Sequence, residues 1–149
     1  MKTTTFVRLL ATTLVGCSAS AFASPGALMV SDCWIRTLPG NLPSGAYFSI
    51  MNMGGIPIDL TGVASDAFSM AMLHRTEQSG STSKMIMIEK AGVPAHGSLD
   101  FAPGGYHVML EHPKQPLKLG TSIPLRLVFS DGEHITTQCA VKAANATTP

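Results

Sequence analysis

The chain carries little charge, few aromatic residues and no run of like charges. Asp, Glu, Lys and Arg make up 13% of the 149 residues, aromatic residues make up 6%, and the formal net charge is +1. A nucleic-acid-binding surface needs clustered Lys and Arg, so we expect no nucleic acid as a partner. The sequence also offers no Ser/His/Asp set and no paired carboxylates for hydrolysis, and we therefore expect a protein that is not an enzyme.

Sustained helical periodicity is also missing after the first two dozen residues, and no later segment is apolar enough for a transmembrane helix. Short apolar and β-branched segments alternate instead with turn residues such as Gly, Pro, Asn and Ser. Eight or nine strands at this spacing predict an all-β fold, either an antiparallel sandwich or a Greek-key barrel. The expected strands are 28–36, 45–53, 58–64, 68–75, 84–90, 97–102, 105–111, 123–130 and 134–142.

The first 23 residues have the features of a secretory signal peptide. Lys2 and Arg8 precede a short apolar run. The segment ends in an A-x-A pattern at Ala21 and Ala23, so we expect cleavage after Ala23. The segment LVGC, which ends at Cys17, also resembles a bacterial lipoprotein processing site, in which Cys17 would carry the lipid. Both alternatives predict an exported protein, and we expect it in the periplasm.

The exported part is expected to be one domain at residues 24–142, followed by a small polar tail at 143–149 that we expect to be flexible. The domain contains two cysteines, Cys33 and Cys139, in the first and last expected strands. An even number of cysteines in an oxidising compartment favours a disulfide. A bridge requires Cα atoms within about 7 Å, so a disulfide and two buried free thiols both stay open.

Histidine and methionine form one conspicuous pattern. His107 and Met109 lie two apart on an expected strand, where they share a face. His74 ends an earlier strand, and Met85 follows a polar turn. If these strands pack together, two imidazoles and two thioethers converge. Thioether sulfur is a soft, neutral donor that favours Cu(I), whereas zinc prefers His, Cys and carboxylate and a blue-copper site needs a thiolate. The four residues predict a Cu(I) site, with core packing as the alternative.

Other residues near this set have more than one possible role. Met87 shares a strand face with Met85 and could replace it as a ligand. Met72 could contact the copper or pack in the core. The glycines before the His/Met strand, Gly104 and Gly105, predict a tight turn with positive φ. The remaining expectations place Met51, Met53, Trp34 and Tyr106 in the core and His96, His112 and His134 at the surface.

The spacing H-x10-M-x21-H-x-M resembles the signature of the PCuAC family of periplasmic copper chaperones. In this sequence, its four positions are His74, Met85, His107 and Met109. The segments SDCWIRTLP, YFSIMNMG, PGGYHVML and KQPLKLG also resemble that family, and the resemblance covers nearly all of residues 28–142. It implies a cupredoxin-like β-barrel that binds Cu(I) and delivers it towards the CuA centre of cytochrome oxidase. Cys33 and Cys139 depart from the family's pattern, because its members commonly carry other residues there.

The resemblance implies a copper carrier that exchanges its cargo with other envelope proteins. Candidate partners are cytochrome oxidase subunit II and a thiol-containing assembly factor, and we expect the carrier to be a monomer. Weak neutral ligands suit such a role, because a partner's thiolates can replace them one at a time. The alternatives are a copper-buffering or resistance protein without an oxidase client, a copper redox protein, and a strand-rich envelope domain that binds no metal.

Overall fold

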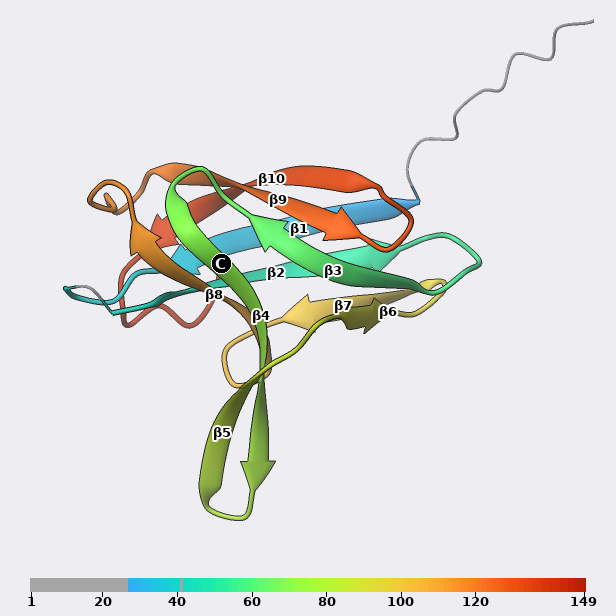
Figure 1. The fold of residues 1–149 in the computed structure, drawn as a ribbon, viewed down its shortest axis with the longest axis horizontal. Coiled ribbons are helices and arrows are strands. Elements are labelled where there is room, and N and C mark those ends of the chain that lie inside the picture. Colours follow the sequence, from blue (N-terminus) through green and yellow to red (C-terminus); the bar gives the residue numbers. More distant parts are fainter. Residues whose placement is uncertain (1–26, 41) are drawn as a thin grey trace, which may run out of the picture.

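The computed structural model describes residues 27–40 and 42–149, and this part of the chain folds into ten β-strands (Figure 1). The predicted signal peptide and Cys17 lie outside the described residues. None of the described residues belongs to a helix long and apolar enough to cross a membrane. The strands are β1 (Leu28–Arg36), β2 (Ser44–Asn52), β3 (Ile58–Ala64), β4 (Phe68–Ser79), β5 (Thr82–Met87), β6 (Ala91–Val93), β7 (Gly97–Phe101), β8 (Tyr106–Pro113), β9 (Ser122–Phe129) and β10 (His134–Lys142).

The predicted all-β fold is confirmed, and β1, β3 and β10 occupy the ranges expected from the sequence. Two details differ. The three-residue strand β6 was not predicted, because it is too short to show an alternating pattern. The polar segment expected to be a turn is mostly strand, since β4 runs to Ser79 and β5 begins at Thr82. Pairing across the hairpin, including Glu77 opposite Lys84, outweighs the turn-like composition there.

The strands form one sheet in the order β5-β4-β8-β7-β2-β1-β10-β9-β3-β6, and β8 also pairs with β2. Most neighbours are antiparallel, but β1 pairs with β10 and β7 pairs with β8 in parallel. The sheet curls on itself, so that β3 contacts β4 and β6 contacts β7. The first and last strands, β1 and β10, lie side by side in a Greek-key barrel because they pair directly. The β4–β5 hairpin projects from the body of the barrel (Figure 1).

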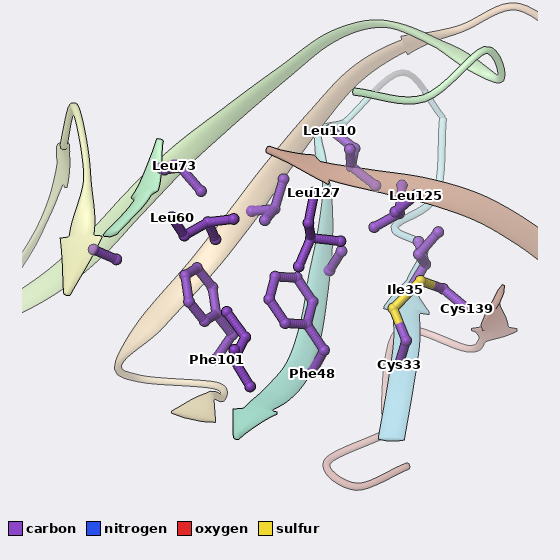
Figure 2. Close-up of a cluster of buried hydrophobic side chains, with 14 of the residues drawn as sticks. Cys33, Ile35, Phe48, Leu60, Leu73, Phe101, Leu110, Leu125, Leu127 and Cys139 are labelled. Carbon is purple, nitrogen blue, oxygen red and sulfur yellow. A yellow bond between two sulfur atoms is a disulfide. The ribbon is translucent and has the colours of Figure 1, made fainter. Parts of the chain in front are cut away.

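The core fills the inside of this curled sheet (Figure 2). It contains Ile35, Phe48, Leu60, Leu110 and Leu127, which are almost completely buried. These side chains come from strands far apart in the sequence, because alternate residues of each strand face inward. The rings of Phe48 and Phe101 stack with centroids 4.5 Å apart. The expected burial of Trp34 is confirmed, and Tyr106 packs against the core while partly exposed.

The prediction that Met51 and Met53 lie in the core is wrong, because both side chains are exposed. Their neighbours Ile50 and Asn52 are the inward-facing residues of this part of β2. An apolar run on a strand does not reveal which of its two faces is buried when both contain apolar residues. His96, His112 and His134 are exposed as predicted.

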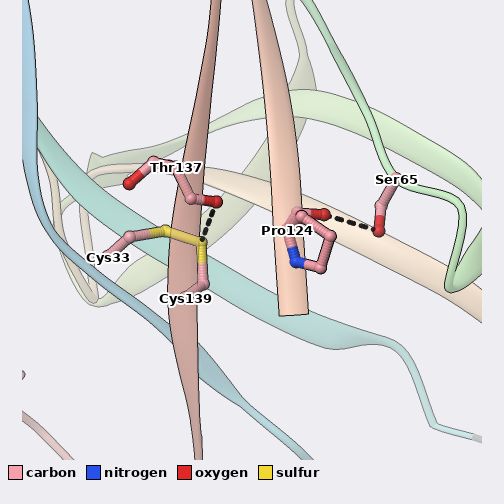
Figure 3. Close-up of a disulfide and its surroundings, with 5 residues drawn as sticks. All are labelled: Cys33, Ser65, Pro124, Thr137 and Cys139. Atoms are coloured by element: carbon pink, nitrogen blue, oxygen red, sulfur yellow. Dashed lines mark hydrogen bonds between the residues drawn. A yellow bond between two sulfur atoms is a disulfide. The ribbon is translucent and has the colours of Figure 1, made fainter. Parts of the chain in front are cut away.

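Cys33 and Cys139 form a disulfide, which excludes the alternative of two free thiols (Figures 2 and 3). Their Cα atoms are 4.4 Å apart although 106 positions separate the cysteines in the sequence. The parallel pairing of β1 with β10, which places Trp34 opposite Ala140, brings them together. Nearby, the Ser65 hydroxyl donates a hydrogen bond to the carbonyl oxygen of Pro124 at 3.0 Å (Figure 3).

Candidate metal site

The predicted histidine and methionine residues meet on the strands β5, β4 and β8, which are adjacent in the sheet. His74 of β4 pairs with Met87 of β5 on one side and with His107 of β8 on the other. Met72 pairs with Met109 one step along the same ladder. Residues directly opposite each other in a sheet share a face, and so do residues two apart on a strand. All five side chains therefore lie on the outer face of these three strands.

Met85 lies on this face as well, but not directly beside His74. It pairs with Thr76, and it is 59% exposed, while Met87 is 70% exposed. Met85 is the diagonal neighbour of His74, at a distance that a long, flexible thioether side chain can cover. Both methionines of β5 are thus within reach of His74. The ligand role of Met85 stays a prediction.

The two imidazoles present nitrogen atoms without hydrogen-bond partners. Their ring centroids are 5.7 Å apart, with the planes inclined at 60°. The Nδ1 atom of His107 lies 3.1 Å from the carbonyl oxygen of Gly105. Since a carbonyl only accepts, Nδ1 carries the proton and Nε2 keeps its lone pair. That Nε2 and the Nδ1 of His74 are buried and find no partner among the described residues. A buried polar atom in this state costs about 1–3 kcal/mol unless a ligand satisfies it.

The environment of His74 favours its neutral form. Burial, and after it the neighbouring imidazole of His107, lowers the pKa of His74 from its ordinary value of 6.5, while the carboxylate of Glu111 acts in the opposite direction. A histidine can bind a metal only when the coordinating nitrogen is unprotonated. Near neutral pH, His74 is therefore available as a ligand.

A tight turn positions His107 at the start of β8. The amide of Gly105 donates a hydrogen bond to the carbonyl of Ala102 at 3.0 Å, and Gly104 has φ 83°, as in a type II turn. The predicted positive φ is confirmed for Gly104 and wrong for Gly105. The carbonyl of Gly105 accepts hydrogen bonds from Thr76 N as well as from His107 Nδ1. The sequence predicted the turn but did not identify this acceptor, which fixes the imidazole.

An aromatic cluster borders the site beyond Met109, and no pattern in the sequence indicates it. Met109 pairs with Gly45 of β2, and the hydroxyl of Tyr47 covers Gly45 so closely that an added Cβ would lie 2.6 Å from it. Arg36 donates a hydrogen bond to this hydroxyl at 2.6 Å, and Trp34 packs on the Tyr47 ring at 4.6 Å between centroids. The site is therefore closed on the β2 side and open towards the β4–β5 hairpin.

The exposure of the side chains increases across the site, from the β2 side towards the β4–β5 hairpin. His107 is only 6% exposed, whereas the methionines of the projecting hairpin are mostly exposed. Within residues 27–40 and 42–149, no three His, Cys, Asp or Glu side chains are grouped so that they could hold a metal ion. A metal on this face would therefore depend on thioether sulfur as well as imidazole. That donor set fits the soft ion Cu(I) and fits zinc or a hard cation poorly.

The protein is a cupredoxin-like β domain. The outer face of its strands β4, β5 and β8 carries imidazole and thioether groups. Residues 28–141 match the family described as "Putative lipoprotein LpqE-like", and the chain belongs to that family. It is 34% identical over 128 residues to "Putative lipoprotein Lxx21020" of Leifsonia xyli subsp. xyli, an alignment that covers 80% of this chain and 76% of that protein.

Solved structures with similar folds include PCuAC domains. The apo PCuAC domain of PmoF2 has a TM-score of 0.70 at 24% identity, covering 85% of this chain and 98% of that one, and supports the cupredoxin-like fold. The copper-bound form of that domain has a TM-score of 0.67 at 25% identity, covering 80% and 96%. The solution structure of Cu(I)-DR1885 from Deinococcus radiodurans has a TM-score of 0.64 at 30% identity, covering 87% and 85%. The predicted resemblance to PCuAC is confirmed.

Proposed function

We propose that this protein is a copper carrier that holds Cu(I) on the outer face of β4, β5 and β8. One observation carries the proposal. Among the residues that the structure describes, the Nδ1 of His74 and the Nε2 of His107 are buried without hydrogen-bond partners, on a face shared with several thioethers. The copper-bound PCuAC domain of PmoF2 and Cu(I)-DR1885, both similar in fold to this chain, support copper as the cargo.

The ligands we propose are His74, Met85, His107 and Met109. All four are neutral, so the bound ion keeps its single positive charge, which an open surface site tolerates. Thioether sulfur stabilises Cu(I) relative to Cu(II), and the set lacks the thiolate of a blue-copper electron carrier. We therefore propose that copper stays Cu(I) while it is bound, and that the protein performs no catalytic turnover.

The gradient of exposure supports a mechanism of transfer. A partner's thiolate approaches from the side of the β4–β5 hairpin, which projects from the barrel (Figure 1) and carries the exposed thioethers of Met85 and Met87. As the first thiolate binds Cu(I), one thioether dissociates, and a second thiolate then replaces another ligand. The buried imidazoles are released last. Each thiolate replaces one ligand, the remaining ligands then dissociate and leave Cu(I) bound by the partner's two thiolates, and the copper is neither oxidised nor reduced.

We further propose that the protein acts in the bacterial envelope, where copper is delivered towards the CuA centre of cytochrome oxidase. The PCuAC resemblance supports this destination, with subunit II or a thiol-containing assembly factor as the acceptor. The "lipoprotein" in the family's description supports export, and it fits lipid attachment at Cys17 as an alternative to cleavage after Ala23. Copper buffering without a dedicated client is the second candidate function.

An anaerobic competition titration of the purified protein with a chromophoric Cu(I) chelator tests the site. We expect one tight equivalent of Cu(I), and we expect a His107→Gln/Met109→Leu variant to lose it. The matched control is His134→Gln, which changes an exposed histidine on β10 and should bind like the unmodified protein. Absence of a tight equivalent in the unmodified protein, or its retention in the double variant, contradicts the proposal.

Delivery is distinguished from buffering by the rate of transfer. The Cu(I)-loaded protein is mixed with the apo CuA domain of subunit II, or with a thiol-containing assembly factor, and the copper bound to the acceptor is followed over time. Delivery predicts transfer faster than spontaneous release of Cu(I) to a chelator, because acceptor thiolates attack the bound ion directly. Transfer no faster than that release would favour buffering.

A further inference from the structure

A second group of histidine and methionine side chains lies at the far end of β2. Met29 of β1 lies directly opposite Met51 of β2, and Met53 follows two residues later. His96 immediately precedes β7, the strand that pairs with this end of β2. We call the side chains of Met29, Met51, Met53 and His96 the methionine corner. The corner unites three connected parts of the sheet that are remote in the sequence.

The corner is shaped by the backbone around it. Met51, Met53 and His96 line the same surface hollow. The amide of His96 donates a hydrogen bond to the carbonyl of Gly54 at 3.1 Å, and the imidazole extends over Gly55, where an added Cβ would lie 3.6 Å from Nε2. His96 has φ 50°, a left-handed conformation that is uncommon for residues other than glycine. The backbone therefore holds this imidazole at the hollow.

Packing does not account for these methionines. Met29, Met51 and Met53 are 48%, 45% and 56% exposed, and none of them belongs to the hydrophobic core. Beside these methionines the outer face is polar, with Ser98 opposite Met51 and a hydrogen bond of 2.6 Å from the Ser49 hydroxyl to the Asp100 carboxylate. Exposed apolar side chains gathered on a polar face commonly mark a binding site.

We propose that the methionine corner is a second binding site for a soft monovalent metal ion, Cu(I) or its analogue Ag(I). Three thioethers and one imidazole supply neutral, soft donors, which these ions prefer and hard cations do not. The Asp100 carboxylate on the same face adds a favourable negative charge nearby. Because the thioethers are open to solvent, the corner binds more weakly than the site at His107 and exchanges its ion faster.

The two sites are separate. Gly45 at the start of β2 pairs with Met109 of the first site, and Met51 is six residues further along the strand. At about 3.3 Å per residue, the two points are roughly 20 Å apart. One ion cannot bridge them, so each site takes its own equivalent. The corner's chemistry is argued from its own residues and does not depend on the proposed function.

The test is a titration of the purified protein, labelled with 13C at the methionine methyl groups, with Ag(I) and then anaerobically with Cu(I). We expect two binding events, the weaker of which shifts the methyl signals of Met29, Met51 and Met53. In a Met29→Leu/Met51→Leu/Met53→Leu variant, the weaker event should be lost and the tight one kept. The reciprocal His107→Gln/Met109→Leu variant should lose only the tight event.

A His96→Asn variant adds a milder change, because asparagine tolerates the left-handed conformation but supplies no imidazole. We expect it to weaken only the second event. Absence of metal-induced shifts at the methyl signals of Met29, Met51 and Met53 in the unmodified protein, or an unchanged second event in the triple leucine variant, overturns the proposal. Failure of the first site would instead remove the tight event and leave the shifts of the methionine corner in place, so the two failures are distinguishable.

Discussion

The two faces of β8 differ in what they contain and in what they do. Val108 and Leu110 point inward and are fully buried in the core. His107 and Met109 alternate with them and point to the outer face, beside His74 of β4. A strand reverses its side chains at every residue, so four consecutive positions can serve the core and a surface site at once. Stability and metal binding should therefore respond to different substitutions in the same segment.

Among changes to the core, removal of the disulfide should lower the free energy of unfolding most. A Cys33→Ser/Cys139→Ser variant should lose about 4 kcal/mol of unfolding free energy, because the bridge closes a very long loop in the unfolded chain. Urea denaturation measures the loss. The outer face is untouched, so the folded variant should still bind the tight equivalent of Cu(I). A loss of copper binding by this folded variant would show that the two faces are not independent.

Substitutions at two neighbouring residues of β8 separate the role of the core face from that of the outer face. Leu110→Ala should cost about 3 kcal/mol of stability, because it leaves a cavity in the core, and should leave Cu(I) stoichiometry unchanged. Met109→Leu should cost less than about 1.5 kcal/mol, because volume is nearly conserved, and should greatly weaken Cu(I) binding. Denaturation and chelator competition are measured on both variants. Equal loss of stability in the two variants would show that Met109 contributes to the core as much as Leu110 does.

The two methionines of β5, Met85 and Met87, should contribute unequally to Cu(I) affinity. We expect Met85→Leu to weaken Cu(I) binding about tenfold, or about 1.4 kcal/mol, and Met87→Leu to have a smaller effect. The family signature favours Met85, whereas the register places Met87 directly opposite His74. Chelator competition on the two single variants measures the difference. The reverse order of effects would make Met87 the ligand.

The smallest expected effect is on the pH dependence of the site. Since the pKa of His74 lies below its ordinary value of 6.5, protons should compete with copper only in more acidic solution. We expect constant Cu(I) affinity between about pH 7 and 8 and a decline below about pH 6. The unfolded chain binds this proton more readily than the native one, so the copper-free protein should also lose a little stability as the pH falls through 6.5.

A pH series of chelator competitions and urea denaturations checks both parts of this prediction. The His134→Gln variant is again the control, and its curves should match those of the unmodified protein. Full retention of Cu(I) affinity at pH 4.5 would contradict coordination by two histidines.

Local patterns were sufficient to predict many of the strands. β1, β3 and β10 have strand-forming residues bounded by turn residues, and these signals act over a few positions. The same locality explains the errors. β6 is only three residues long, and the turn expected between β4 and β5 is shorter than its polar composition indicated. Composition could not show that pairing with a neighbouring strand continues the ladder there.

The histidine and methionine residues illustrate the same limit. Their chemistry and their spacing predicted an imidazole and thioether site, and β5, β4 and β8 do bring them to one face. The misplacement of Met51 and Met53 shows that a strand with apolar residues on both faces does not reveal its buried side. The methionine corner, which joins these residues to His96, therefore could not be predicted without knowing which strands pair.

The all-β class, the soft character of the donors and the face shared by His107 and Met109 follow from the amino-acid sequence, because they depend on side-chain chemistry and on the period of a strand. The folded barrel is needed to place Cys33 beside Cys139, Met87 opposite His74 and the carbonyl of Gly105 against the imidazole of His107. These contacts depend on the register between strands and on the turns that join them. Register results from the packing of the whole barrel, which no short segment of the sequence specifies.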